Sequence, residues 1–314
     1  MKKAAIGIDL GGTNIKSVLL ALPSLRLLEQ DSRPTQAEYG AARVVENMAL
    51  AAEALIKSAG RSGAKVSALG AGSAGLVDRG VVRNSPNLPG WQGAVPLGRL
   101  LAKRLSKHRL AITVENDVNV FVLAETRLGA ARGFENVIGL TLGTGVGGGI
   151  VADGRLYRGA TGGAGELGHM VVKLDGPRCK CGNTGCLESL VGSQAIVKRY
   201  NDLRFRAHMR MEGSITVKEI AGRARRRDRQ AILALAETGR LLGIGLANIA
   251  NIFNPQAVVI GGGVAQAGRL ILKPAIDEMR RRAMPYNVKS IKVLQASLGP
   301  MAGAMGAALV SIKD

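Results

Sequence analysis

Two similar stretches decide the fold of this chain: Gly7-Ile8-Asp9-Leu10-Gly11-Gly12-Thr13 and Gly139-Leu140-Thr141-Leu142-Gly143-Thr144-Gly145. In each, an apolar run typical of a β-strand enters a glycine turn, and a second strand-like run follows, at 14–20 and at 146–152. Each stretch therefore predicts a strand–turn–strand hairpin. Because the hairpin occurs twice, we expect two related domains that face one another across a cleft.

Helical patterns lie between the strand-like runs, for example at 41–59 and 231–253, and a further strand at 257–260 runs into three glycines. Strands that alternate with helices predict an α/β fold. The domain boundary is expected near Asp117, where an extended segment gives way to a helix over 118–128.

This boundary assigns 1–117 to a smaller N-terminal α/β domain. Residues 118–302 then form a larger α/β domain that contains a cysteine-rich loop. The last helix, about 303–314, is apolar, so we expect it to pack back on the first domain and to belong to it.

Composition narrows the class of protein. With 314 residues, 46% of them hydrophobic, the chain is long enough for two domains with a large core. No charge-free apolar run reaches the roughly 18 residues of a membrane span, and the short apolar start lacks a signal-peptide cleavage site. We therefore expect a cytoplasmic protein with no membrane partner.

The net charge of +20 favours anionic partners such as nucleotides, polyphosphate or nucleic acid. Part of this charge lies in 199–229. Only 3% of the residues are aromatic, however, which leaves little surface on which nucleic-acid bases could stack. We interpret the basic run as a solvated helical face and do not expect a nucleic-acid partner.

A glycine turn between two strands lets backbone N–H groups approach phosphate oxygens closely. Asp9 lies where a carboxylate could orient Mg²⁺, Lys16 faces either the phosphates or solvent, and the turn after 257–260 suits an adenosine. Neither hairpin is a Walker loop, and each turn alone is equally typical of an ordinary hairpin. The predicted nucleotide-binding residues are Asp9, Gly11, Gly12, Thr13, Lys16, Gly143, Thr144, Gly145, Gly261, Gly262 and Gly263.

The three cysteines of the chain, Cys179, Cys181 and Cys186, lie within eight residues of one another, shortly after His169. Three thiolates and one imidazole complete a tetrahedral zinc shell. A shell of four protein ligands leaves no open position, so the sequence predicts a structural zinc ion at these four residues. Three unrelated buried cysteines are the poorer interpretation, because the spacing is tight.

Two acidic residues flank this metal segment. Glu166 precedes it beside His169, and Glu188 follows the last cysteine. Folding of the loop around a metal would bring both carboxylates to the imidazole. Carboxylates accept charge-assisted hydrogen bonds from vicinal hydroxyls, so this cluster is a candidate sugar-binding surface.

Together these motifs resemble those of the ROK family (repressors, ORFs, kinases), most closely its bacterial glucokinase-type members. The resemblance covers nearly the whole chain, and the cysteine motif is its most specific part. The motifs are Asp9-Leu10-Gly11-Gly12-Thr13, Glu115-Asn116-Asp117-Val118-Asn119, Gly143-Thr144-Gly145-Val146-Gly147-Gly148-Gly149, Gly165-Glu166-Leu167-Gly168-His169 and the Cys-x-Cys-Gly-x-x-Gly-Cys-x-Glu run from Cys179 to Glu188.

The resemblance implies an actin-like, ribonuclease-H-like fold whose two domains close over a hexose and ATP with Mg²⁺. It implies that Asp117 is the catalytic base for the primary hydroxyl of the sugar, and that the enzyme is a homodimer. It also implies that His169 both ligates zinc and contacts the sugar. The sugar-binding residues it implies are Gly75, Asn87, Asn116, Asp117, Glu166, His169 and Glu188.

Within this resemblance, Asn87 favours glucose as the substrate, with N-acetylmannosamine or N-acetylglucosamine second. The segment 72–75 departs mildly from the family, because it lacks the proline that often precedes its glycine. It is still expected to line the sugar site.

Three alternatives stay open at this stage. Asp117 is also a good helix N-cap residue, which needs no catalytic role. The family includes sugar-responsive regulators, but only eight residues precede Asp9, too few for a helix-turn-helix domain. Polyphosphate could replace ATP as donor, although members that use it tend to lack the cysteine motif.

Overall fold

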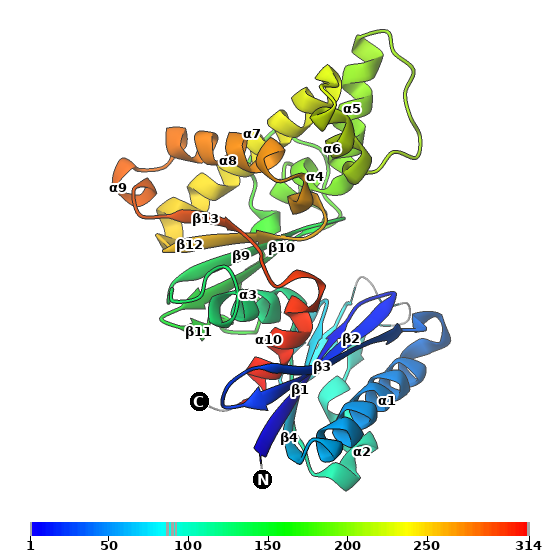
Figure 1. The fold of residues 1–314 in the computed structure, drawn as a ribbon. Coiled ribbons are helices and arrows are strands. Elements are labelled where there is room, and N and C mark those ends of the chain that lie inside the picture. Colours follow the sequence, from blue (N-terminus) through cyan, green and yellow to red (C-terminus); the bar gives the residue numbers. More distant parts are fainter. Residues whose placement is uncertain (1, 86–87, 89–90, 92, 313–314) are drawn as a thin grey trace. The chain divides into compact units, whose positions relative to one another are not determined.

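The computed structural model describes residues 2–85, 88, 91 and 93–312 (Figure 1). Contacts divide the chain into two compact units, which are described separately. Unit 1 comprises Met1–Gly133, Ile150–Ala164 and Ser297–Asp314, and unit 2 comprises Phe134–Gly149 and Gly165–Ala296. The predicted domains, 1–117 with 303–314 and 118–302, stay a prediction.

The first five-stranded sheet has the order β3-β2-β1-β4-β8. β1 pairs antiparallel with β2 and parallel with β4, and β4 pairs parallel with β8. The hairpin predicted around the first glycine turn is therefore present. The strands are β1 (Lys2–Leu10), β2 (Asn14–Leu22), β3 (Leu27–Pro34), β4 (Ala64–Ser73) and β8 (Ala111–Asn116).

The second five-stranded sheet has the order β11-β10-β9-β12-β13. β12 pairs parallel with both β9 and β13, as β4 pairs with β1 and β8 in the first sheet. Both sheets thus follow one plan, which confirms the repeat seen in the sequence. The strands are β9 (Val137–Leu142), β10 (Val146–Ala152), β11 (Arg155–Leu156), β12 (Ala257–Gly261) and β13 (Lys292–Gln295).

The remaining elements surround these sheets. A small antiparallel sheet contains β5 (Leu76–Asp78), β6 (Val81–Arg83) and β7 (Ala94–Val95). The α-helices are α1 (Gly40–Arg61), α2 (Leu97–Arg104), α3 (Asp117–Arg127), α4 (Leu187–Val191), α5 (Ser193–Arg206), α6 (Val217–Arg225), α7 (Arg229–Phe253), α8 (Arg269–Arg282), α9 (Pro285–Val288) and α10 (Ala302–Val310). The 3-10 helices are η1 (Ala37–Tyr39), η2 (Ser106–His108), η3 (Leu167–His169), η4 (Val264–Ala267) and η5 (Gly299–Met301).

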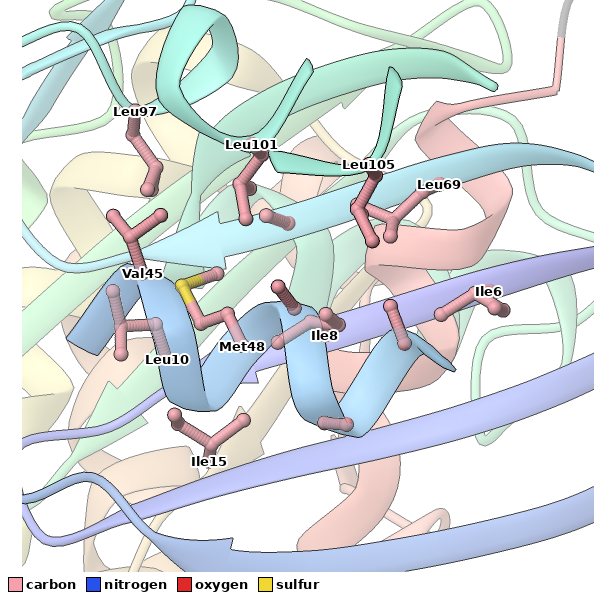
Figure 2. Close-up of a cluster of buried hydrophobic side chains, with 14 of the residues drawn as sticks. Ile6, Ile8, Leu10, Ile15, Val45, Met48, Leu69, Leu97, Leu101 and Leu105 are labelled. Atoms are coloured by element: carbon pink, nitrogen blue, oxygen red, sulfur yellow. The ribbon is translucent and has the colours of Figure 1, made fainter. Parts of the chain in front are cut away.

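Helices cover both faces of strand β1. Successive side chains of a strand point to opposite faces, so neighbouring residues of β1 pack in different clusters. Ile6 and Ile8 join the cluster that α1 and α2 cover (Figure 2). Ala5 packs on the other face, against Ala304 and Ala308 of α10. The last helix therefore packs on the first sheet, and β1 is an uninterrupted buried run from Ala4 to Ile8.

Helix α7 is the longest helix of unit 2. By length and composition alone it could cross a membrane, but 56% of its most apolar window is buried, as in the core helix of a globular protein. Two glycines allow the close packing of α7 on α8. A side chain at Gly239 or Gly243 would start 2.4 or 2.5 Å from a carbonyl oxygen of α8.

Candidate functional site

In unit 1, the first hairpin brings Asp9 and Lys16 opposite one another on β1 and β2. Asp9 is half-buried. Burial and then the charge of Asp117 raise the pKa of Asp9 to about 6, and the charge of Lys16 opposes this shift. Helix α10 lies against the same carboxyl, since a side chain at Gly303 would start 2.7 Å from Asp9 Cγ. Asp9, Lys16 and Asp117 thus form one charged group.

The start of α3 places Asp117. Asn116 is the last residue of β8, with an extended backbone, and its Oδ1 accepts hydrogen bonds from the N–H groups of Val118 (2.8 Å) and Asn119 (3.1 Å). Its Nδ2 donates to the carbonyl of Gly75 at 3.1 Å. The N-cap of this helix is therefore Asn116, and the interpretation of Asp117 as the cap is wrong. Asp117 is the first helical residue, and its Oδ1 also accepts from Val118 N–H.

The glycine turns themselves close tightly. The N–H of Gly11 donates to the carbonyl of Asn14 at 3.1 Å, and that of Gly143 donates to the carbonyl of Gly145 at 2.9 Å. These two N–H groups are used within the turns, so the candidates for phosphate contact are the amides that follow them. Thr13 and Thr144 are both exposed at the turns.

Sequence reasoning gave no role to Glu115, whose side chain is only 6% exposed. Its Oε1 accepts hydrogen bonds from Asn116 N–H (2.9 Å) and from Asn119 Nδ2 (3.0 Å). Its Oε2 accepts from Arg158 Nε at 2.6 Å. A buried carboxylate needs such partners, and these hold the segment that leads to Asp117. The nearest sequence signal is the position of Glu115 inside the Glu-Asn-Asp motif.

In unit 2, Glu188 is attached to the second hairpin. Its Oε2 accepts a hydrogen bond from Val146 N–H at 3.0 Å. Gly145 leaves the space for this carboxylate, because a side chain there would start 2.4 Å from the same oxygen. The loop that carries His169 lies along the same strand, since a side chain at Gly168 would start 2.0 Å from the carbonyl oxygen of Val146.

The four predicted metal ligands lie together. One ligand atom from each of His169, Cys179, Cys181 and Cys186 lies within 4.8 Å of all the others. His169 Nδ1 is 3.7 Å from Cys179 Sγ, and the sulfurs of Cys181 and Cys186 are also 3.7 Å apart. Burial raises the pKa of the Cys186 thiol to about 12.

The two predicted acidic neighbours adjoin this cluster. Glu166 Oε2 is 3.7 Å from His169 Nε2, the ring nitrogen that does not face Cys179. Glu188 Oε1 is 3.6 Å from Cys179 Sγ. The structure therefore brings Glu166, His169 and Glu188 together around the thiols.

Unit 2 also holds a cavity of about 680 Å³. Gly143 and Thr144 of the second hairpin line it together with Gly263, so two of the predicted nucleotide turns converge here. Gly262 has φ 89, and a side chain there would start 2.3 Å from the carbonyl oxygen of Leu142. This explains why the turn after β12 contains glycine.

Most of the cavity wall comes from α5, from α6 and from the two residues before α6, which sequence reasoning did not connect with the nucleotide. The sequence marks the start of α6, because Thr216 and Glu219 form a capping box. No sequence pattern marks the approach of α6 to the glycine turns. The additional lining residues are Ser193, Gln194, Val197, Lys198, Ile215, Thr216, Val217, Lys218, Val264 and Gln266.

Of the predicted sugar-binding residues, Gly75 lies in a loop of unit 1. Gly75 has φ 103, in the region that favours glycine, and a side chain there would start 2.6 Å from the carbonyl oxygen of Arg83. Its carbonyl is the acceptor for Asn116. Asn87 lies outside the described residues.

Comparison with known proteins agrees with this fold and these motifs. A model of the ROK family matches residues 5–314. The glucokinase of Thermotoga maritima is 37% identical over 98% of this chain and 97% of its own length. The solved structure of a ROK family glucokinase from Streptomyces griseus, in complex with glucose and AMPPNP, is 34% identical, with a TM-score of 0.79 and coverage of 98% and 99%.

Regulators are also similar, over part or nearly all of this chain: a putative xylose repressor of Caldicellulosiruptor sp. is 32% identical over 98% of this chain and 78% of its own length. The xylose repressor of Bacillus subtilis is 33% identical over 66% of this chain and 52% of its own length. The two sheets of one strand order define an actin-like ATPase fold with two domains. Within that class, the chain belongs to the ROK family.

Proposed function

We propose that this chain is an ATP-dependent hexose kinase that transfers the γ-phosphate of ATP to the 6-hydroxyl of glucose. The observation that carries the proposal is the identity with a glucokinase over nearly the full length of both chains. The site geometry supports it, because each unit presents carboxylates beside a glycine hairpin.

Asp117 is the proposed general base. Asn116 performs the capping of α3, so the helix does not require a carboxylate at the next position. The base accepts the proton of the attacking hydroxyl, and phosphoryl transfer otherwise depends on positioning and charge neutralisation. Asp9 is the proposed partner of Mg²⁺, which when bound neutralises phosphate charge. The raised pKa of Asp9 fits this role, because a cation would relieve its repulsion with Asp117.

The cavity of unit 2 is the proposed adenosine site, with the phosphates toward the glycine turns. Gly143, Thr144 and Gly263 line it, and α5 and α6 supply apolar and basic side chains. Gly11, Gly12, Thr13 and Lys16 of the first hairpin, with Gly145, Gly261 and Gly262 of the second unit, complete the proposed nucleotide-binding set. ATP is the proposed donor in preference to polyphosphate.

The thiol cluster is the proposed site of a structural zinc ion. Bonds of about 2.3 Å to sulfur and about 2.0 Å to nitrogen place tetrahedral ligands roughly 3.5–3.8 Å apart. The two 3.7 Å separations in the cluster fit this geometry. Ligation through His169 Nδ1 leaves Nε2 on the side of Glu166. When bound, zinc would fix the ring and the loop that leads to Glu188.

Sugar hydroxyls are assigned to Glu166, His169 and Glu188 of unit 2. Gly75, Asn87 and Asn116 of unit 1 are assigned to the same substrate. Carboxylates accept charge-assisted hydrogen bonds from hydroxyl groups, and His169 Nε2 offers one further contact. A homodimer and a cytoplasmic location complete the proposal.

A coupled ADP-release assay tests this function. Glucose, mannose, fructose, N-acetylglucosamine and N-acetylmannosamine are compared, each with ATP and with polyphosphate. We expect the highest kcat/KM for glucose with ATP. A higher value for an N-acetylhexosamine would reject the sugar assignment, and a higher value with polyphosphate would reject the donor.

A sugar-responsive regulator is the second candidate, favoured by the similarity to xylose repressors. It predicts glucose binding in calorimetry without turnover, together with salt-dependent retention on DNA. Turnover with any hexose rejects it.

A further inference from the structure

Unit 1 contains a second cavity, of about 400 Å³, that the proposed kinase chemistry does not use. It is formed around α3, which contacts both α10 and β11 (Figure 1). The turn after β2, the last part of α3, the segment around β11 and the end of α10 supply its walls. Every one of these segments belongs to unit 1.

Three arginines line this cavity: Arg127, Arg155 and Arg158. Arg127 Nη2 donates to the carbonyl of Gly154 at 3.2 Å, which ties the end of α3 to the turn before β11. Arg158 donates through Nε to Glu115. That bond uses one of the five N–H donors of a guanidinium, so four others remain on the group.

The rest of the wall is largely aliphatic, and Leu25, Leu156 and Leu309 are among its residues. Leu25 has φ 57, a backbone conformation that residues other than glycine rarely adopt. The turn between β2 and β3 thus holds a leucine at the cavity where glycine would be unstrained. An apolar wall beside a cationic wall is the lining of a site for an amphipathic anion.

We propose that this cavity binds a small organic anion, a phosphate monoester or a carboxylate, that carries an aliphatic body. Guanidinium groups match both anions in bidentate geometry. A volume of about 400 Å³ is in the range of small-molecule sites. Of the nearby carboxylates, Glu115 is already paired with Arg158, and Asp153 lies in the turn before β11. The three arginines therefore outnumber the acidic groups beside them.

Isothermal calorimetry on the full chain tests the proposal. The probes are hexyl phosphate, heptanoate and inorganic phosphate, each with saturating AMPPNP present to occupy any nucleotide site. We expect one hexyl phosphate to bind per chain. Each buried methylene should tighten binding roughly fourfold, so inorganic phosphate should bind far more weakly. Heptanoate separates a carboxylate site from a phosphate site.

The variant Arg155→Glu should weaken binding of hexyl phosphate at least about tenfold, because a charge-assisted contact is replaced by repulsion. Arg155 is the suitable choice, since Arg158 also satisfies the buried Glu115. Arg99→Glu is the matched control: Arg99 is exposed on α2 and does not line the cavity. Its binding should equal that of wild type.

Three results would overturn the proposal. The first is that neither hexyl phosphate nor heptanoate binds at millimolar concentration. The second is that Arg99→Glu weakens binding as much as Arg155→Glu does. The third is equal binding of inorganic phosphate and hexyl phosphate, which would mean that the aliphatic wall contributes nothing.

Discussion

The two glycine hairpins share one backbone plan but obtain their carboxylates differently. In unit 1 the carboxylate is Asp9, on strand β1 itself, while the corresponding residue of β9 is Thr141. In unit 2 the carboxylate is Glu188, the second residue of α4, whose hydrogen bond to Val146 N–H attaches it to the hairpin.

This difference makes the second hairpin depend on the cysteine-rich loop. Cys186 is the N-cap residue of α4, and Cys179 Sγ lies 3.6 Å from Glu188 Oε1. The carboxylate of the first hairpin instead lies with Lys16 of its own sheet, Asp117 of α3 and Gly303 of α10. The repeated fold therefore fixes the backbone of both turns, and separate segments supply the chemistry.

The largest expected effect is in unit 1, at Asp117. Asp117→Asn keeps the size of the side chain but removes the proton acceptor, so kcat should fall by about 10²–10⁴-fold. The free energy of unfolding should barely change, because Asn116 is the cap. Steady-state kinetics and thermal unfolding, measured on one preparation, check both statements.

Substitution of the helix cap Asn116 should affect stability, in contrast to substitution of Asp117. Asn116→Ala should lower the free energy of unfolding by about 1 kcal/mol or more, since the N-cap bonds and the contact with Gly75 are lost. If Asp117→Asn retains near-normal turnover, Asp117 is not the base, and Glu166 becomes the next candidate.

The second effect concerns the cysteine-rich loop of unit 2. Cys181→Ala should abolish zinc binding, which we expect at about one ion per chain, and lower the free energy of unfolding by several kcal/mol. Elemental analysis and thermal unfolding measure these effects. Lys180→Ala, an exposed neighbour, should retain the ion. Freshly purified wild type without zinc would reject the metal assignment.

The third effect tests how α10 supports the first hairpin. A side chain at Gly70 of β4 would start 1.6 Å from the carbonyl oxygen of Ala307, so Gly70→Ala should cost about 3 kcal/mol of unfolding free energy. Gly60→Ala is the control, because nothing lies within 4 Å of that position in α1. It should stabilise by about 0.5–1 kcal/mol. Equal denaturant midpoints for the two variants would contradict the close packing.

Local patterns in the sequence predicted the local parts of this fold. The strands 137–142 and 146–152 and the helix 231–253 agree with the structure within two residues, because apolar period and glycine turns define them. The cysteine spacing likewise predicted the cluster. Choosing Asn116 over Asp117 as the cap was not possible from sequence, since both residues cap helices about equally well and only the end of β8 decides.

Contacts between distant segments could not be predicted in this way. The pair of Glu115 and Arg158 joins residues far apart in the chain, and no periodicity marks it. The same holds for the approach of α5 and α6 to the glycine turns. Such pairings depend on how helices pack on sheets, which one sequence does not encode in any short pattern.

The smallest expected effect is on stability at Asp9, and its sign follows from the pKa. Burial and Asp117 raise this pKa from 3.8 to about 6, so the folded state binds the proton more strongly than the unfolded state. The stability that protonation provides is present at low pH and is lost as the pH rises through about 6. Above that pH the charged carboxylate costs on the order of 1–3 kcal/mol.

Asp9→Asn removes this cost. The variant should therefore be more stable than wild type at pH 8, and the difference should disappear near pH 4. Denaturant unfolding at both pH values measures it, with Asp78→Asn, a half-exposed carboxylate of the same unit, as the control. Turnover should fall although stability rises, because a buried charge kept for Mg²⁺ is costly to the fold. An Asp9→Asn variant less stable than wild type at pH 8 would mean that favourable contacts hold the charged Asp9. The carboxylate of the first hairpin would then stabilise the fold and would not be a cost to it.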